Sequence, residues 1–454
     1  MAVAAVSIFL SPKTNSEQSF FLGYTQDGLP PSLLSLMVSH VMTWLFARSL
    51  LNAVILGFNY GVWGVLAYAV YYGSFISAAF IVDSIRFKHG FTSIHDFLND
   101  RFGRVGTRCY HVVVGIRLMS EVFANLLVVG LLFGPEGSGA YIGIILFFSL
   151  FTLFYSVQGG LRASIRTGGF QMIVFTMLLA ALIGVVLGIP EFSWAVFEVQ
   201  PFNLSEPGVV LLLVAFLHVI SYPMHDPVLM DRGFIADRQT TRRSFFHAYW
   251  MSTLFIVIFG ILGVFAASQA LVNEAMNTVL LRLLGPIPML FFSAALIVAA
   301  MSSLNSTLSS SAKWVALDMK VMAPTLKNGR TAMCLFLLLS VLLVFVGSND
   351  VFTLFALSGL ASLYLLPVIV FSVCLGWSAL PTWCYGFSFV LALGATLLYF
   401  FESSQYTQVI ASLTGISDSP SQLLALSLIV VVGSFLAFCL AKWIQVRWYP
   451  VYGG

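Results

Sequence analysis

The sequence predicts an all-α polytopic membrane protein with about twelve transmembrane helices, and three observations support this fold class. Hydrophobic residues make up 59% of the 454 residues and charged residues only 9%, whereas a soluble domain carries about a quarter charged residues. Long apolar runs near the length of a bilayer crossing recur along the chain. Lys and Arg are distributed very unevenly between alternate loops.

The apolar runs define the predicted helices in chain order. They fall at 31–58, 62–85, 107–133, 138–158, 161–188, 207–224, 244–271, 287–312, 330–348, 350–376, 380–401 and 422–446. Residues 1–30 are predicted to form an N-terminal tail or the remnant of a leading helix. The runs at 380–446 are predicted to be two accessory helices at the periphery.

The loop charges predict the orientation of the chain. If the first helix starts in the cytoplasm, the inside segments hold seventeen of the 21 Lys and Arg residues, with Arg232 counted in the inside loop 225–243. The outside loops then hold only Arg282. We therefore expect a multi-pass protein of the cell (inner) membrane with both termini cytoplasmic. At the inner end of the second helix, Asp83 is expected to pair with Arg86.

Several function classes find no support in the sequence. The five cysteines have no metal-ligand spacing, and there is no nucleotide fingerprint, phosphate loop or basic nucleic-acid patch. We expect no enzyme activity, no organic cofactor, no nucleic-acid partner and no obligate protein partner. The expected partners are the lipid bilayer, a small-molecule solute and an ion.

One predicted helix carries an unusual number of oxygen atoms. Seven of the ten residues from Ser302 to Ser311 bear a hydroxyl, and Asn305 adds an amide. A helical period places most of them on one face, namely Ala299, Ser302, Ser303, Ser306, Ser309 and Ser310. Small residues let membrane helices pack closely. Alternatively, these hydroxyls supply part of a monovalent cation site, completed by the free carbonyls of a neighbouring broken helix.

Four segments together resemble one known family. The segment "AAMSSLNSTLSSSAKWVALDM" contains an Ala-x-x-Ser-Ser element similar to that of the solute:sodium symporter family. The segments "FFLGYTQDGLPPSLLSLMVSH", "FTSIHDFLNDRFG" and "YSVQGGLRASIRTGGFQ" resemble the family's entry to the first core helix, the loop after helix 2 and the turn into helix 5. These matches cover most of residues 20 to 330 in the family's order.

The resemblance implies the inverted-repeat fold of the leucine-transporter type. A first five-helix repeat at 31–188 would be followed by an inverted five-helix repeat at 207–376, with helices 1 and 6 interrupted near the bilayer midplane. Pro223 and Pro227 favour the interruption of helix 6, whereas the stretch 39–57 of helix 1 has no Pro or Gly before Gly57. The resemblance also implies a sodium site made by Met42, Leu45, Ala299, Ser302 and Ser303.

The sequence departs from the family pattern at two positions. Gly168 stands where the family usually has an Asp associated with sodium handling, which favours a single coupled sodium ion. Arg48 lies in the middle of helix 1, where the family usually has small residues. A charged side chain in the hydrocarbon region is costly, at about 2.5–3.5 kcal/mol on insertion scales, and therefore requires a function or a partner.

The other charges within predicted helices allow two interpretations. Arg117 and Glu121 are spaced to form a salt bridge within helix 3, or Glu121 faces Arg48 across a substrate cavity. A cavity with Arg48 suits a carboxylate-bearing solute, because a guanidinium binds a carboxylate bidentately. The predicted substrate-binding residues are Arg48, Asn52, Glu121, Asn125, His218, Tyr222 and Asn305. For His218, a hydrogen-bonded packing role is an equal alternative.

Together these features predict a sodium-coupled secondary symporter. It would import a small polar solute that carries a carboxylate, such as an amino acid, a betaine-like compound or an organic acid. Two alternatives stay open, namely a sodium-independent or proton-coupled transporter or exchanger of the same fold, and a membrane solute sensor that does not pump.

Overall fold

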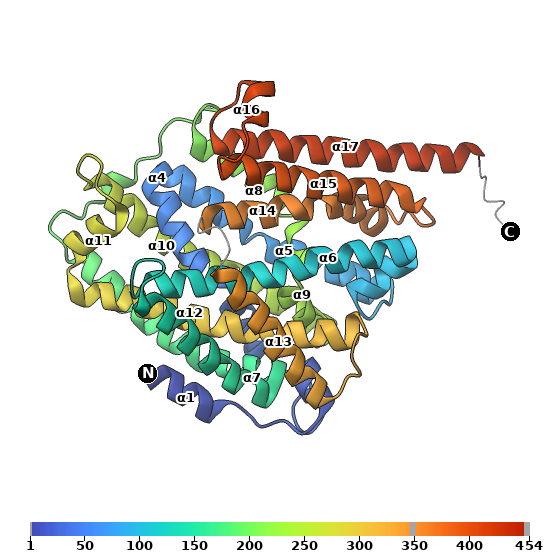
Figure 1. Ribbon diagram of the computed structural model, residues 1–454, viewed down its shortest axis with the longest axis horizontal. Helices are drawn as coiled ribbons and strands as arrows, with labels where there is room; N and C mark the ends of the chain where they lie inside the picture. The colour runs from blue at the N-terminus through green and yellow to red at the C-terminus, as the bar shows by residue number, and fades with distance from the viewer. Residues whose placement is uncertain (1, 346–350, 449–454) are drawn as a thin grey trace.

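The chain folds into a bundle of long helices that lie side by side (Figure 1). The structure is a computed structural model that describes residues 2–345 and 351–448, and these residues form no strand. Nine of the described helices are long and apolar enough to span a membrane, and α3 (Leu33–Trp44) and α8 (Pro207–His218) are shorter apolar helices. The predicted all-α polytopic fold is confirmed. The predicted junction at 348–350 and the chain beyond 448 lie outside the described residues.

Two of the nine spans each join parts of two predicted helices at a glycine. In α4 (Ala47–Tyr71) the break is at Gly61, with φ 58°, and in α7 (Gly139–Leu187) it is at Gly160, with φ 55°. Glycine adopts this backbone conformation without steric cost. At Gly160 an added Cβ would also lie 2.3 Å from the Phe20 carbonyl oxygen. Each of the twelve predicted runs overlaps a helix of the structure.

The remaining elements complete the bundle. Their bounds are α1 (Ala2–Leu10), α2 (Glu17–Leu22), α5 (Ser74–Val82), η1 (Asp83–Lys88), α6 (Ile94–Leu131), η2 (Trp194–Phe197), η3 (Tyr222–His225), α9 (Pro227–Gly233), α10 (Arg238–Ser268), α11 (Met276–Leu284), α12 (Pro286–Lys313), η4 (Trp314–Asp318), α13 (Leu326–Val344), α14 (Val351–Ser362), η5 (Leu363–Leu365), η6 (Val368–Cys374), α15 (Thr382–Ser403), α16 (Val409–Thr414) and α17 (Ser419–Trp448). The short helix α11 lies at one end of the bundle (Figure 1). The division into repeats at 31–188 and 207–376 stays a prediction.

The first predicted helix is interrupted between α3 and α4. Leu45 and Phe46 have extended or irregular backbone angles, although neither is Gly or Pro. Two side chains from other helices satisfy the backbone at this break. The Tyr72 hydroxyl donates to the Trp44 carbonyl (3.1 Å), and the Asn125 Oδ1 accepts from the Ala47 N–H (3.0 Å). The break therefore depends on tertiary hydrogen bonds that replace those of the helix.

The sixth predicted helix is interrupted between α8 and α9. The chain leaves α8 after His218, forms the short helix η3, and then becomes extended at Asp226. Asp226 caps α9, since its Oδ1 accepts from the Leu229 N–H (3.2 Å), and Pro227 occupies the first helical position. An Asp cap followed by Pro is a strong helix start. The interruption predicted from Pro223 and Pro227 is therefore present.

The two ends of the chain pack against the central helices. α1 lies along α7, where Gln171 Nε2 donates to Ser7 Oγ (3.3 Å). α15 and α17 lie together at one side of the bundle (Figure 1). Although α17 is at the periphery, Ser427 Oγ is 2.9 Å from His218 Nε2 at the end of α8. The accessory helix therefore contacts the interrupted helix directly.

One predicted ion pair is wrong. Asp83 pairs with Arg238 through two contacts, 2.6 Å to Nε and 2.8 Å to Nη2, whereas the Arg86 Nη1 donates to the Gly233 carbonyl (2.9 Å). The error arose because sequence proximity favoured Arg86, but the loop between α9 and α10 brings Arg238 to Asp83.

Replacement of Asn125 should destabilise the interruption of the first helix. In the Asn125→Ala variant the buried Ala47 N–H loses its partner, which costs about 1–3 kcal/mol. The measurement is the free energy of unfolding in detergent micelles.

Ser156→Ala is the matched control for this prediction. Ser156 is fully buried, but its hydroxyl bonds only to the Thr152 carbonyl of its own helix (2.7 Å). We expect a much smaller loss from this variant. Equal losses from the two variants would contradict the role given to Asn125.

Candidate functional site: a buried ion cluster between the two interrupted helices

The two helix interruptions meet at the centre of the bundle. Trp44, the last residue of α3, donates from Nε1 to Oδ2 of Asp226, the cap of α9 (3.1 Å). The Tyr222 ring of η3 packs edge-on against the Trp44 ring, with the ring centroids 5.6 Å apart. All three side chains are at most 3% exposed. The irregular backbone of both helices is therefore buried in protein, which is where a bilayer tolerates it.

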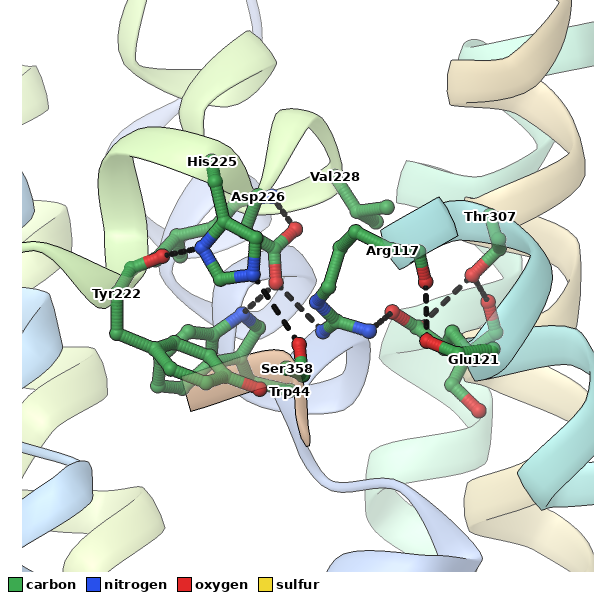
Figure 2. Close-up of polar contacts among 12 residues, drawn as sticks. Trp44, Arg117, Glu121, Tyr222, His225, Asp226, Val228, Thr307 and Ser358 are labelled. Atoms are coloured by element: carbon green, nitrogen blue, oxygen red, sulfur yellow. Dashed lines mark hydrogen bonds and ion pairs between the residues drawn. The ribbon is translucent and has the colours of Figure 1, made fainter. Parts of the chain in front are cut away.

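Arg117 of α6 connects the two interruptions to a continuous helix. Its guanidinium lies between two carboxylates, with Nη2 2.6 Å from Asp226 Oδ2 and Nη1 2.7 Å from Glu121 Oε2 (Figure 2). The guanidinium is also 5.4 Å from the centroid of the Phe46 ring. The three charged side chains are at most 1% exposed. We call Arg117, Glu121 and Asp226 the ion cluster.

The ion cluster extends to the hydroxyl-rich helix α12. The Thr307 hydroxyl is 2.8 Å from Glu121 Oε1 and 2.9 Å from the Ser303 carbonyl oxygen of its own helix. Of the two interpretations of the charges in helix 3, the structure has the salt bridge between Arg117 and Glu121. Residues from α3, α6, α9 and α12 thus share one network of polar contacts.

Arg48 lies next to the ion cluster. Its guanidinium carbon is 5.7 Å from the centroid of the Phe46 ring, the ring that also faces Arg117. Arg48 is 1% exposed, and within the described residues its Nη1 has no hydrogen-bond partner and no carboxylate lies within ion-pair distance. A buried guanidinium without its full set of partners is costly. This geometry is suited to a ligand that brings an acceptor.

Two other predicted substrate residues lie near Arg48. Asn52, one turn further along α4, is fully buried, and within the described residues neither its Nδ2 nor its Oδ1 has a hydrogen-bond partner. Tyr222 packs against both Trp44 and Tyr71, and the Arg117 guanidinium carbon is 5.8 Å from its ring centroid. The structure therefore brings Arg48, Asn52 and Tyr222 to one aromatic and cationic region beside the ion cluster.

The structure places the other predicted substrate residues in contacts within the protein. Both nitrogens of His218 are bonded, to the Tyr71 and Ser427 hydroxyls, each at 2.9 Å. Asn125 holds the break of the first helix. Asn305 faces α7, where its Nδ2 donates to Thr167 Oγ1 (3.3 Å).

The predicted sodium ligands lie at the break of the first helix and on α12. No backbone N–H of the described residues beyond the break bonds the carbonyls of Met42 or Leu45. On α12, the Ser303 hydroxyl donates to the Ala300 carbonyl (3.2 Å), which leaves its lone pairs as acceptors. These carbonyl and hydroxyl oxygens, with those of Ala299 and Ser302, form a donor set that fits a hard cation.

A third buried arginine, Arg232, contacts Ser306, which lies one helical turn from Ser302. Arg232 was predicted to belong to an inside loop, and this prediction is wrong, because Arg232 is 0% exposed in α9. It donates to the hydroxyls of three helices, Ser39 (2.7 Å), Ser164 (3.0 Å) and Ser306 (3.1 Å). The apparent loop is a short helix that turns inward, so loop charge counting misplaced this residue.

Four residues of the site were not among the predicted site residues, namely Trp44, Asp226, Arg232 and Thr307. Asp226 is conspicuous in the sequence as a charge late in helix 6, but its position there favours only an anchor of a cytoplasmic gate. For Asp226 a signal was present, because Asp followed by Pro227 marks a helix start inside an apolar segment. Thr307 and Trp44 carried no signal of their own, since their roles depend on Glu121 and Asp226 across helix contacts.

Comparison with known proteins supports the fold. The chain matches no protein-family model and no curated protein. Among solved structures, it is similar to a Na+-coupled sialic acid symporter in an outward-open state, with TM-score 0.74, 14% identity, and coverage of 97% of this chain and 95% of that chain. It is also similar to MhsT in complex with L-phenylalanine, with TM-score 0.58, 15% identity and coverage of 90% and 98%.

A third solved structure has the same arrangement. It is Mhp1, a nucleobase-cation-symport-1 family transporter, with TM-score 0.57, 16% identity and coverage of 97% of each chain. The chain therefore shares the fold of these three solved transporters, the leucine-transporter-type fold that the sequence resemblance predicted.

Removal of the arginine from the ion cluster should be strongly destabilising. In the Arg117→Gln variant, Glu121 and Asp226 lose their shared cation inside the bundle, and breaking a buried ion pair in this way costs about 3–5 kcal/mol. Equilibrium unfolding in mixed micelles measures the loss.

Arg282→Gln is the comparison for Arg117→Gln. Arg282 also pairs with a carboxylate, Glu274, but on the surface, where its side chain is 42% exposed. We expect no measurable change for this variant. A result in which Arg117→Gln is as stable as Arg282→Gln would contradict the central role of the ion cluster.

Proposed function

We propose that this protein is a secondary active transporter that moves a small polar solute by alternating access. The single observation that carries the proposal is the meeting of two interrupted helices at the buried ion cluster, through the contacts of Asp226 with Trp44 and Arg117. Interrupted helices that face each other deep in a membrane protein are typical of transporter binding sites. Ionisable groups at this depth also favour a solute pathway over a purely structural role.

The buried charges favour a solute with a carboxylate. Among the residues that the structure describes, the Lys, Arg, Asp and Glu side chains at most 1% exposed are three arginines and two carboxylates, namely Arg48, Arg117, Arg232, Glu121 and Asp226. Arg117 already contacts both carboxylates, so Arg48 has a positive charge without a close counter-ion. A solute carboxylate would supply that counter-ion and a bidentate partner. An amino acid, a betaine-like compound or an organic acid carries the required group.

We further propose that sodium is the coupling ion. Met42 and Leu45 would contribute carbonyl oxygens released by the helix break, and Ala299, Ser302 and Ser303 would complete the shell from α12. The sodium gradient would then drive import across the cell membrane, with both termini on the cytoplasmic side.

One observation favours a second candidate, sodium-independent transport: Arg232 places a positive charge one turn from these ligands. A solute sensor that does not pump is a further alternative with the same fold.

Replacement of Arg48 should abolish recognition of the carboxylate. A panel of small metabolites is first screened by thermal stabilisation of the purified protein, since a ligand at 100 times its Kd stabilises by about 2.7 kcal/mol. Arg48→Gln should then weaken binding of the stabilising carboxylate by a factor of about 10 or more, because a charge-assisted hydrogen bond contributes about 1.5–3 kcal/mol.

The control for this prediction is Arg86→Gln. Arg86 bonds a backbone carbonyl, that of Gly233, away from the ion cluster, and its replacement should leave solute binding unchanged. If only neutral sugars stabilise the protein, or if Arg48→Gln binds carboxylates as tightly as the parent chain, then Arg48 is not the carboxylate-binding residue.

Removal of the two α12 hydroxyls should weaken the sodium response. In a Ser302→Ala, Ser303→Ala double variant, the concentration of sodium that gives half of the thermal shift should rise at least tenfold relative to the parent chain, with choline chloride keeping ionic strength constant. Ser309→Ala is the matched control, because this buried hydroxyl bonds only the Asn305 carbonyl of its own helix (2.8 Å). An equal sodium response in all three proteins would rule out the proposed ligands.

A further inference from the structure

The Arg232 guanidinium is surrounded by the hydroxyl groups of three helices. Its Nε donates to Ser39 of α3, and its Nη2 donates to Ser164 of α7 and Ser306 of α12, while Nη1 donates to the Val228 carbonyl (2.5 Å). The oxygens also contact one another, since Ser306 Oγ is 2.7 Å from Ser164 Oγ and 3.0 Å from Thr43 Oγ1. We call Ser39, Thr43, Ser164 and Ser306 the hydroxyl cluster.

Arg232 has no carboxylate partner among the described residues. Its neighbour in the chain, Asp231, is instead in an ion pair with Lys313 at the end of α12. The carboxylates nearest in the core, Asp226 and Glu121, are both paired with Arg117. The guanidinium is therefore a full positive charge, 0% exposed, held by neutral oxygens alone. Ionisable side chains inside a membrane protein commonly mark the pathway of a substrate or an ion, which favours a functional role for this unpaired charge.

The hydroxyl cluster adjoins the predicted sodium ligands. Ser306 follows Ser302 by one helical turn and donates to its carbonyl (3.0 Å), and Thr43 follows Met42 directly in the chain. One turn corresponds to about 5.4 Å along the helix. Two positive charges held on neighbouring turns of the same helix, with little water between them, repel each other.

We propose that Arg232 is a built-in cation that competes with sodium at this position. This proposal rests on the sodium coupling proposed above. It adds the charge of Arg232 as a determinant of sodium affinity. With sodium absent, the guanidinium joins α3, α7, α9 and α12 through the hydroxyl cluster. A sodium ion at Met42, Leu45, Ala299, Ser302 and Ser303 weakens these contacts by repulsion, and the contacts in turn lower the affinity for sodium. Sodium binding is thereby coupled to the contacts that α9 makes with α3, α7 and α12.

A neighbouring cavity offers a place for the displaced guanidinium. A cavity of about 430 Å³ opens beside α9, and its lining includes the carboxylates of Asp96, Asp231 and Asp318. Lys313 and Lys320 also line it. Because consecutive residues of a helix point about 100° apart, the guanidinium would have to swing around α9 from the neutral oxygens to the side of Asp231 to reach this cavity.

Gly168 provides a test that leaves Arg232 in place. Gly168 follows Ser164 by one turn of α7, and a Cβ at this position would have Met42 Cβ as its nearest neighbour, at the ordinary contact distance of 3.9 Å. In a Gly168→Asp variant, the new carboxylate would lie on the same face as Ser164 and would offset the charge of Arg232. Gly168→Asn has the same size without the charge and is the matched control.

The experiment is a sodium titration of thermal stability in detergent, with choline chloride as the balancing salt. Relative to the parent chain, Arg232→Gln and Gly168→Asp should each lower the half-saturating sodium concentration at least tenfold, which corresponds to about 1.4 kcal/mol. Arg232→Lys, Gly168→Asn and the surface variant Arg282→Gln should each stay within about threefold of the parent chain. If Arg232→Gln does not fold, Gly168→Asp and Gly168→Asn decide the question.

The outcomes separate this inference from the proposed function. If the parent chain responds to sodium and neither Arg232→Gln nor Gly168→Asp changes its affinity, Arg232 is a structural residue and the competition is refuted, while sodium coupling stands. If no variant responds to sodium but a solute still stabilises the protein, competition and sodium coupling are both refuted, and solute transport by another coupling mechanism stands.

Discussion

The contacts of Arg117 are the interaction on which the centre of this structure depends. A membrane interior supplies no water to solvate a charge or an unbonded backbone N–H or C=O group. The backbone groups of an interrupted helix therefore need hydrogen-bond partners on neighbouring helices. Asp226 provides them for one interruption by capping α9, and it also bonds Trp44 at the other interruption. Arg117 compensates the charge of Asp226 and ties both interruptions to Glu121 on α6. Without the guanidinium, two carboxylates would face each other in a dry space.

The hydroxyl-rich segment of α12 has more than one role in this arrangement. Thr307 contacts Glu121 of the ion cluster, whereas Ser306 contacts Arg232 and Ser164 on another side of the helix. Several further hydroxyls, such as those of Ser309 and Ser311, bond only carbonyls of their own helix. The cation site, the second interpretation from the sequence, stays a prediction. Close packing explains some serines, and the support of buried charges explains others.

The sequence predicted the fold well because bilayer length, loop charge and helix-breaking residues are local properties. The apolar runs gave the helices, and Pro223 and Pro227 gave the interruption of the sixth helix. The interruption at Leu45 and Phe46 followed only from the family resemblance, because the groups that stabilise it, Tyr72 and Asn125, are distant in sequence. A break without Gly or Pro has no local signal.

The candidate site was predictable only in part, for a related physical reason. Arg48 and the pair of Arg117 and Glu121 were conspicuous as charges inside apolar runs. Arg232 was not, because it lies in a polar stretch whose composition resembles a loop but which folds back into the core as α9. Partner choice was the least predictable property. Asp83 bonds Arg238 and Arg86 bonds a carbonyl, as the packing of α9 and α10 dictates.

The central claim is that the space between the interrupted helices is a transport site rather than a binding site alone. The most direct measurement is uptake of a stabilising, isotopically labelled carboxylate into proteoliposomes that contain the purified protein, with and without an inward sodium gradient. We predict protein-dependent uptake that rises above the equilibrium level only while the gradient lasts. Binding of the solute without any flux across the bilayer would contradict transport and would favour a sensor.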